Sequence, residues 1–329
     1  MTPFQKALAD AIKADGPMPL DAFMEACNAY YYATRDPFGA AGDFTTAPEI
    51  SQMYGELVGA ALADAWARAG RPEGVRYAEL GPGRGTLAAD ALRVMRSAGC
   101  NPASVEFIET SPVLREAQRQ AVPGATFRDD IAGLGEGDGP LLLVASEFFD
   151  ALPVVQSVGG YARRVEFIGG HFAFDRDGEI VETSPARSEA MGALARLLAD
   201  TGGVGLIIDY GHGEANEAGD TLQALRGHRF ANPLENAGEQ DLTSHVDFAA
   251  LAEAATAGGA EVSRLAAQGT WLETLGIGGR AMALAARNPE RTEEIAAARR
   301  RLCDEGEMGR LFKVMAVAGK GWPMPAGLE

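Results

Sequence analysis

The sequence predicts an α/β fold built on a doubly wound, Rossmann-like parallel sheet. Strand-like and helical segments alternate through Glu79, Glu109 and Asp129, as the repeated strand–helix unit of such a sheet requires. A glycine-rich turn at 81–85 follows the first of these strands and opens a helix. The apolar run at 141–145 is typical of a strand buried on both faces. At 329 residues, the chain is long enough for one elaborated domain or for two.

The N-terminal region, residues 1–74, is predicted to form a helical and aromatic-loop cap. The segment 2–5 is a capping box that starts one helix, and a second helix is expected to follow it. The stretch 30–44 combines aromatic residues with prolines and glycines, which predicts an irregular but packed loop. A second capping box at 46–49 is expected to start a long amphipathic helix that ends near Arg68.

The sheet and its helices are expected over residues 75–320, followed by a tail at 321–329. Short β-prone stretches punctuated by glycines predict an antiparallel insertion at 154–183. Loop and helical insertions are predicted at 211–260 and 270–308. The remaining strands are expected at 204–210, 261–265 and 311–317.

The turn after the first strand indicates a nucleoside-bearing cofactor. Gly81, Gly83 and Gly85 allow backbone conformations closed to other residues and let a ligand press against the main chain. The dinucleotide fingerprint G-x-G-x-x-G would need a later glycine, where this chain has Thr86. Glu79 precedes the turn, and an acid there suits the amino group and sulfonium of S-adenosyl-L-methionine (SAM) better than a pyrophosphate. The turn therefore favours SAM over NAD.

Acids also follow the second and third strands. Glu109 lies 28 residues after Gly81, where a carboxylate can accept hydrogen bonds from both ribose hydroxyls. The alternative is that Glu109 only caps the helix that begins near Ser111. Asp129 and Asp130 lie near the end of the third strand, where one of them could receive the adenine amino group or both could simply be solvated.

A further pair of acids, Glu147 and Asp150, follows the fourth strand. Ligands of open α/β sheets bind over the carboxyl ends of the strands, so a methyl acceptor belongs beside these acids. An arginine acceptor stays cationic because its pKa exceeds about 12, and Glu147 could grip its guanidinium in bidentate fashion. Asp43 and Glu49 are secondary candidates. Helix capping is an alternative role for Glu49, and capping of the strand end for Glu147.

Two polar segments, 209–212 and 243–247, form another candidate cluster. His212 and His245 could act as a base or contact a substrate. The alternative is that each is a hydrogen-bonding loop residue. No two histidines or cysteines have the spacing of a metal site, so no bound metal is expected.

Composition bounds the partners and the compartment. The chain has 29 Lys and Arg against 46 Asp and Glu, a net charge of −17, which predicts that nucleic acids and anionic membranes are repelled and that a basic protein is attracted. No apolar run approaches the roughly 18 residues of a membrane span. The first residues lack the features of a signal peptide or presequence, and the three scattered cysteines form no disulfide framework. These features predict a cytoplasmic protein.

Five segments resemble, in order, the MidA-like class I methyltransferases: 42–53, 79–86, 147–153, 208–211 and 242–248. That family includes the mitochondrial assembly factor that methylates an arginine on a core subunit of respiratory complex I. The resemblance spans nearly the whole chain. It implies a class I SAM-dependent protein arginine methyltransferase that releases S-adenosylhomocysteine and closes its aromatic loop over the cofactor.

The residue patterns and the resemblance together give the predicted site. Two departures from the family are Ser146, where asparagine is frequent, and a shortened tyrosine segment before Arg35. The expected partner is a protein with a basic acceptor side chain, such as a complex I subunit. The predicted catalytic residues are Glu147, Asp150 and Glu49; the predicted cofactor-binding residues are Glu79, Gly81, Gly83, Gly85, Thr86, Glu109, Asp129 and Asp130; and the predicted substrate or lid residues are Asp43, Phe44, Thr45, Asp209, Tyr210 and His245.

Two other functions are compatible with the same patterns. One is an assembly chaperone that binds SAM as a structural ligand with little turnover. The other is an NAD-dependent oxidoreductase, which the position of Glu79 disfavours.

Overall fold

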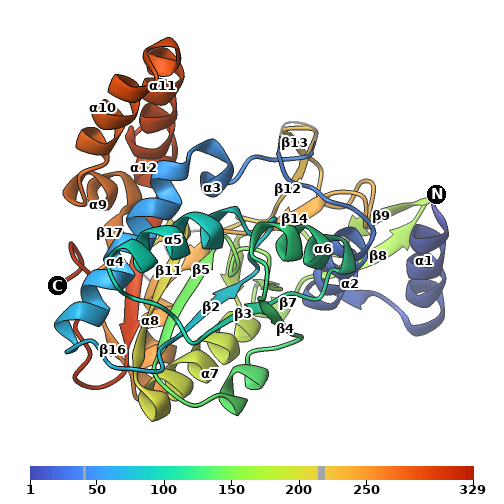
Figure 1. The fold of residues 1–329 in the computed structure, drawn as a ribbon. Coiled ribbons are helices and arrows are strands. Elements are labelled where there is room, and N and C mark those ends of the chain that lie inside the picture. The colour runs from blue at the N-terminus through green and yellow to red at the C-terminus, as the bar shows by residue number, and fades with distance from the viewer. Residues whose placement is uncertain (40–41, 214–218) are drawn as a thin grey trace.

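A computed structural model of the chain describes residues 1–39, 42–213 and 219–329, so part of the insertion expected at 211–260 lies outside the described residues. Its main sheet confirms the predicted doubly wound α/β fold (Figure 1). Within the described residues the sheet has nine strands. They are β2 (Arg76–Leu80), β3 (Ser104–Ile108), β4 (Thr126–Arg128), β5 (Leu141–Ser146), β11 (Gly203–His212), β15 (Val246–Asp247), β16 (Glu261–Val262), β17 (Ala266–Ala267) and β18 (Phe312–Ala318).

The strand order places four candidate segments at one edge of the sheet. The order is β16-β18-β11-β5-β2-β3-β4, and β15 and β17 pair with β11 and β18. The strands from β4 to β11 are mutually parallel, whereas β18 runs antiparallel to β11. Because parallel strands end on the same side, the segments that follow β2, β3, β5 and β11 converge there.

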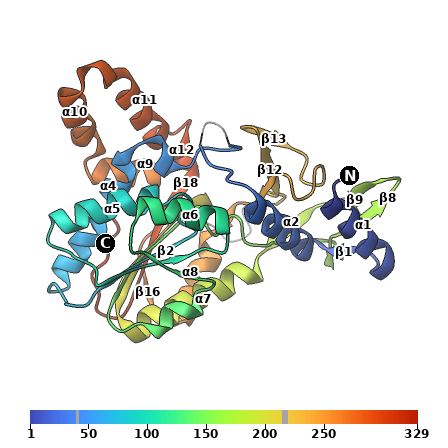
Figure 2. The same ribbon diagram turned by 45° about the vertical axis from the view of Figure 1, so that its right-hand side comes forward.

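Helices cover both faces of this sheet. Along β5, Leu142 and Val144 pack into one apolar cluster, while Leu141 and Leu143 pack into another. The first cluster includes α4 and α5, and the second includes α7 and α8, on opposite faces in Figure 2. This alternation explains why the apolar run of the strand is continuous. The covering helices are α4 (Gln52–Arg68), α5 (Thr86–Ser97), α6 (Pro112–Ala121), α7 (Pro185–Thr201) and α8 (Phe248–Ala257).

A third apolar cluster lies beside the main sheet and joins the N-terminus to the insertions. It contains residues of α1 (Pro3–Asp15) and α2 (Leu20–Thr34) together with Val154, Val165 and Leu242. Three small antiparallel sheets belong to this region, with strand orders β1-β8-β9, β10-β6-β7 and β13-β12-β14. Their strands are β1 (Met18–Pro19), β6 (Val155–Val158), β7 (Tyr161–Ala162), β8 (Arg164–Ile168), β9 (His171–Phe174), β10 (Ile180–Thr183), β12 (Gln223–Arg226), β13 (Arg229–Ala231) and β14 (Asp241–Thr243).

Helices near the C-terminus form an arm on the side of the main sheet away from the third apolar cluster (Figure 1). No helix in the described parts of the chain is both long and apolar enough to cross a bilayer. The arm consists of α9 (Gln268–Thr274), α10 (Ile277–Arg287), a 3-10 helix at Pro289–Arg291, α11 (Thr292–Cys303) and α12 (Met308–Leu311); another 3-10 helix lies at Ala132–Glu136, and α3 (Ala47–Ile50) precedes α4.

Two expectations for the N-terminal region were wrong. The tyrosines at 30–32 belong to α2 rather than to an irregular loop, because Tyr31 and Tyr32 turn inward to bond Asp43 and Asp241. The segment 46–49 does not start the long helix. Its side-chain cap is absent, and Ser51 instead caps α4 by accepting a hydrogen bond from the backbone of Met53.

The contact between α4 and α5 generates a stability prediction. A Cβ added at Gly59 would lie 2.4 Å from the carbonyl oxygen of Ala91, far inside contact distance. We expect Gly59→Ala to lower the free energy of unfolding by about 1–3 kcal/mol, the usual cost of overpacking. Urea unfolding measures this. The matched control is Gly279→Ala in α10, which meets nothing within 4 Å and should raise stability by up to about 1 kcal/mol. Equal effects of the two substitutions would contradict the packing argument.

Candidate functional site

A cavity of about 1160 Å³ lies over the carboxyl ends of β2, β3, β5 and β11. Its walls also come from α2, from the segment 38–49 and from β14. Most predicted site residues line it, so the fold brings together segments that are far apart in the sequence. The lining includes Asp43, Phe44, Thr45, Glu49, Glu79, Gly81, Gly83, Thr86, Glu109, Asp129, Asp130, Glu147, Asp150, Tyr210 and His245.

The glycine turn has the backbone that its sequence predicts. Gly81, Gly83 and Gly85 have φ values of 60°, 55° and 81°, in the left-handed region that favours glycine. A Cβ added at Gly83 would point at the ring of Phe38, 3.4 Å away, across the cavity wall. The main chain of the turn is therefore open to a ligand only while these positions lack side chains. Gly85 does not line the cavity but provides the N-cap of α5.

Glu79 lies almost fully buried at the end of β2, below the glycine turn. Its carboxylate accepts a hydrogen bond of 2.6 Å from the Tyr77 hydroxyl. Burial raises the pKa of Glu79 to about 8. A cation placed against this carboxylate would favour its ionised form, so the position suits a positively charged ligand group.

Glu109 follows β3 and contacts the start of α6, as the capping alternative expects, while its role in ribose binding stays a prediction. One carboxylate oxygen accepts from the backbone N–H of Ser111, which is the N-cap of α6, at 2.8 Å. The other accepts from Gln118 Nε2 at 3.0 Å, and the same nitrogen donates to the carbonyl of Gly83 at 2.6 Å. Gln118 thus fixes the carboxylate relative to the glycine turn. No local pattern singled out Gln118, because its role depends on the packing of α6 against that turn.

The acids after β4 lie at the rim of the cavity. Asp129 has a side chain that is 84% exposed and forms an ion pair with Arg115 at 2.6 Å. Asp130 accepts a hydrogen bond from the backbone of Gly133 at 3.0 Å. These contacts agree with the alternative that both acids are solvent-facing residues of a turn. A role for either acid in adenine binding stays a prediction.

Glu147 has the strained backbone of a functional turn. Its φ is 53°, in the left-handed region that is unfavourable for a residue with a side chain. Its Oε1 accepts from the backbone N–H of Ala47 at 3.1 Å. Burial, and next the charge of Asp150, raise the pKa of Glu147 to about 8. The preceding Ser146 lies with its hydroxyl 3.0 Å from that of Tyr54, so this departure from the family forms a contact within the cavity wall.

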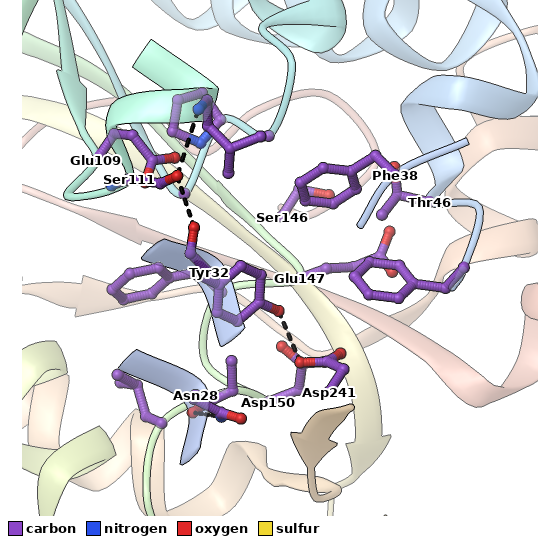
Figure 3. A pocket seen from close by; sticks show the side chains of 18 of the residues that line it. Asn28, Tyr32, Phe38, Thr46, Glu109, Ser111, Ser146, Glu147, Asp150 and Asp241 are labelled. Atoms are coloured by element: carbon purple, nitrogen blue, oxygen red, sulfur yellow. Dashed lines mark hydrogen bonds between the residues drawn. The ribbon is translucent and has the colours of Figure 1, made fainter. Parts of the chain in front are cut away.

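Three acids, Glu147, Asp150 and Asp241, line the part of the cavity that we call its inner end; in Figure 3 Asp150 and Asp241 lie below Glu147. Asp150 is 6% exposed, and its Oδ1 has no hydrogen-bond partner in the described structure. Asp241 accepts from the Tyr32 hydroxyl at 2.8 Å, and burial raises its pKa to about 7. The sequence did not indicate Tyr32 or Asp241, because they lie 209 positions apart and meet only through folding.

Asp209 lies beneath the cavity instead of lining it. It is fully buried, and its carboxylate accepts from the backbone N–H groups of Phe149, Asp150 and Tyr210 at 2.9–3.1 Å. Arg187 of α7 completes the support from the other side. Its guanidinium donates to the carbonyls of Phe149, Asp150, Ser244 and His245 and to the Ser244 hydroxyl. Together these buried charges fix the turn that carries the acids.

The segment 36–49 is tied to the glycine turn and to the acids. Arg84 donates to Asp36 at 2.9 Å and lies 3.7 Å from Glu49, which also accepts from the Thr86 hydroxyl at 2.7 Å. The carboxylate of Glu49 is therefore engaged in these tertiary contacts. Asp43 accepts from the Tyr31 hydroxyl at 2.6 Å and from the backbone of Gly227 at 2.8 Å.

The second polar cluster contributes one wall of the cavity. His245 lines it with its ring packed edge-on against Tyr210, and Tyr210 donates to the Thr243 hydroxyl at 2.5 Å. Burial lowers the pKa of His245, so its imidazole is neutral near pH 7. His212 lines a smaller neighbouring cavity of about 260 Å³. Across the described residues, no group of three His, Cys, Asp or Glu side chains could hold a metal ion.

Comparison with known proteins places this geometry among methyltransferases. The model of an S-adenosyl-L-methionine-dependent methyltransferase family matches residues 57–162 and 160–266. The chain is 33% identical to a mitochondrial protein arginine methyltransferase NDUFAF7 homolog of Drosophila melanogaster, over 95% of this chain and 84% of that protein. It is 30% identical to the mitochondrial protein arginine methyltransferase NDUFAF7 of Homo sapiens, over 84% of this chain and 74% of that protein.

A solved structure supports the same grouping. A Burkholderia thailandensis protein crystallised with S-adenosyl-homocysteine is 25% identical, with a TM-score of 0.86 over 98% of this chain and 93% of that one. The predicted family and the class I methyltransferase fold are confirmed by these findings.

The expected cytoplasmic location is wrong on the same comparison. The curated relatives of this chain are named as mitochondrial proteins, in insect, amphibian, fish and mammal alike. The expectation depended on the absence of recognisable targeting features near residue 1. The mitochondrial names of the relatives contradict it.

The strained φ of Glu147 leads to a stability prediction. Glycine adopts this conformation freely, whereas a Cβ costs about 1–2 kcal/mol there. We therefore expect Glu147→Gly to be more stable than Glu147→Ala by about 1 kcal/mol in urea unfolding. The same pair of substitutions at Glu253, an exposed position within α8, is the control. There the order should reverse, because glycine destabilises a helix by about 0.5–1 kcal/mol relative to alanine. A more stable alanine variant at both positions would rule out strain at Glu147.

Proposed function

The chain belongs to the S-adenosyl-L-methionine-dependent methyltransferases, and from this premise we propose that it methylates an arginine side chain of a protein. The observation that supports this proposal is that one cavity contains both a site suited to SAM and a site suited to a cationic acceptor. One end has the open main chain of the glycine turn, and the other has three acids, one of which has an orphaned carboxylate oxygen.

The donor end fits the shape and charge of SAM. Gly81 and Gly83 line the cavity with left-handed φ values and no side chain, and Glu79 offers a buried carboxylate to a cationic group. Glu109, fixed by Gln118, is placed to accept hydrogen bonds from a ribose. When bound, SAM supplies a methyl group activated by its positive sulfur. We include in the proposal that the predicted cofactor-binding residues around this turn bind SAM.

The acceptor end fits a guanidinium better than a neutral group. Glu147, Asp150 and Asp241 all have pKa values raised by burial, which means that each carboxylate is short of compensating positive charge. The Asp150 Oδ1 is buried without a partner, and a buried acceptor left unsatisfied is costly. A guanidinium presents five N–H donors in a planar fork, so it can satisfy several of these oxygens at once.

The same acids can handle the proton that methylation releases. The guanidinium nitrogen would bond to the methyl carbon as the bond between that carbon and the sulfur of SAM breaks and neutral S-adenosylhomocysteine leaves. The nitrogen would then give up a proton, so that the methylated guanidinium keeps a single positive charge. Glu147 Oε1 is held by the Ala47 backbone, which orients the side chain and leaves Oε2 to face the acceptor. A carboxylate whose pKa is about 8 is a competent proton acceptor near neutral pH.

The family resemblance extends the proposal to the acceptor protein. Relatives named as protein arginine methyltransferases support an arginine acceptor and thus a protein substrate. The resemblance to the complex I assembly factor supports a complex I subunit as that protein, and assembly of complex I as the process served.

Binding of the donor provides the first test. Gly83→Val should abolish SAM binding in isothermal titration calorimetry, because a branched side chain at this φ fills the cradle. Gly99→Val is the control, since Gly99 has a similar positive φ of 84° with nothing within 4 Å. That variant carries comparable strain but should retain SAM affinity. Unchanged affinity in Gly83→Val would remove the turn from the donor site.

The acceptor chemistry is tested by labelling and by its pH dependence. With radiolabelled SAM and a lysate from cells lacking the gene, we expect label on arginine, assigned by mass spectrometry. The ratio kcat/KM should rise as pH increases through about 7–8, because the ionised forms of Asp241 and Glu147 bind the cation.

Glu147→Gln should leave SAM affinity intact and lower kcat/KM by about 10- to 150-fold, the equivalent of a charged hydrogen bond of about 1.5–3 kcal/mol. It should also remove the upper part of the pH rise. SAM binding without any labelled protein would favour a chaperone, and label on a residue other than arginine would exclude the proposed acceptor.

A further inference from the structure

The mouth of the cavity exposes apolar side chains that the catalytic arrangement does not use. Eight large apolar residues in the described chain are exposed, and two of them, Phe230 and Leu311, line this cavity. Phe230 is 77% exposed and Leu311 43% exposed. A single exposed apolar residue needs no explanation, but these two border the same cavity, where both can contact a bound ligand.

Phe230 belongs to the hairpin formed by β12 and β13. In this hairpin Leu225 pairs directly with Phe230, so both side chains point to the same face, and both line the cavity. Arg226 pairs with Arg229 and therefore points to the opposite face. Leu225 and Phe230 thus form an apolar pair on the side of the hairpin toward the cavity, next to the polar Gln223 and His228, which also line it.

Asp43 holds this hairpin in place. Its carboxylate accepts from the backbone of Gly227, its carbonyl accepts from the backbone of His228 at 2.8 Å, and the Tyr31 hydroxyl anchors it to α2. The hairpin and the segment that carries Asp43 therefore form one unit. Phe44, the next residue, continues the apolar wall inside the cavity.

The opposite side of the mouth belongs to the C-terminal arm. Met308 and Leu311 of α12 and Phe312 at the start of β18 line the cavity there. In Figure 1 the hairpin and α12 stand on opposite sides of α3, with the strand ends below them. Arg301 of α11 also lines the cavity and places a positive charge on this side.

We propose that the hairpin face (Leu225 and Phe230) and the α12 face (Met308 and Leu311) grip apolar residues that flank the acceptor arginine in the protein substrate. This inference rests on the proposed function. Charge complementarity identifies the occupant: the acids accept one cation at the inner end, and Arg301, on the side of α12, disfavours a second cation between the two apolar faces. The substrate class is therefore an arginine between apolar neighbours, which narrows the basic partner expected from the net charge.

Defined peptides test this on the full-length protein. Three fluorescein-labelled peptides carry one central arginine flanked by leucines, by glycines or by lysines, and fluorescence polarisation measures their affinities with S-adenosylhomocysteine present. The leucine-flanked peptide should bind at least about tenfold more tightly than the other two, since a few buried apolar anchors dominate such interfaces. Equal affinities for the three peptides would overturn the inference.

Phe230→Ala should weaken the leucine-flanked peptide about tenfold and leave the glycine-flanked peptide and SAM affinity unchanged. The control is Tyr161→Ala, an aromatic residue of β7 that is 70% exposed but does not line the cavity. Equal losses in the two variants would show a nonspecific effect and contradict the inference.

Asp43 is a positioning residue in this scheme. Asp43→Ala should raise KM for the leucine-flanked peptide as Phe230→Ala does. Asp43→Asn should recover most of this loss because its amide oxygen can still accept from Gly227. A fall in kcat alone would contradict this role. Tight, Phe230-dependent binding of a peptide that acquires no methyl group on its arginine would contradict the proposed function and leave the docking inference standing.

Discussion

The turn after β5 depends on two buried charges of opposite sign. Asp209 accepts hydrogen bonds from the backbone N–H groups of Phe149 and Asp150, and Arg187 donates to the backbone carbonyls of the same two residues. An irregular buried segment has no sheet or helix partners for its polar backbone, so these side chains replace them. Burial lowers the pKa of Arg187 and raises that of Asp209, and each charge favours the ionised form of the other. The strained conformation of Glu147 persists because the turn is held from both sides.

That support makes an electrostatically unfavourable cluster possible. Burial raises the pKa values of Glu147, Asp150 and Asp241, and the charge of Asp150 raises those of Glu147 and Asp241 further. A fold selected only for stability would neutralise or separate them. The cluster therefore suits the cationic acceptor that we propose for this methyltransferase.

Local patterns predicted the parts of the site whose geometry is set by neighbours in the sequence. The glycine turn, Glu109 and the acids after β5 were found because a strand followed by a turn fixes where those residues lie. Gln118, Tyr32 and Asp241 were missed, because each gains its role from a contact with a distant segment. The capping box at 46–49 failed for the same reason: the Glu49 carboxylate, which would close the box, accepts from the Thr86 hydroxyl and lies beside Arg84, and Ser51 starts the long helix. Tertiary contacts overrode a correct local preference.

The segment 36–49 links the parts of the cavity that the chemistry requires to act together. It reaches the glycine turn through the pairs Asp36–Arg84 and Glu49–Thr86, the acids through the bond from Ala47 to Glu147, and the mouth through the contacts of Asp43 with the hairpin. A shift of this segment therefore changes the donor end, the acceptor end and the mouth at once. Methyl transfer needs both reactants held in line. Because this one segment contacts all three regions, the positions of the residues at the donor end and at the acceptor end depend on each other.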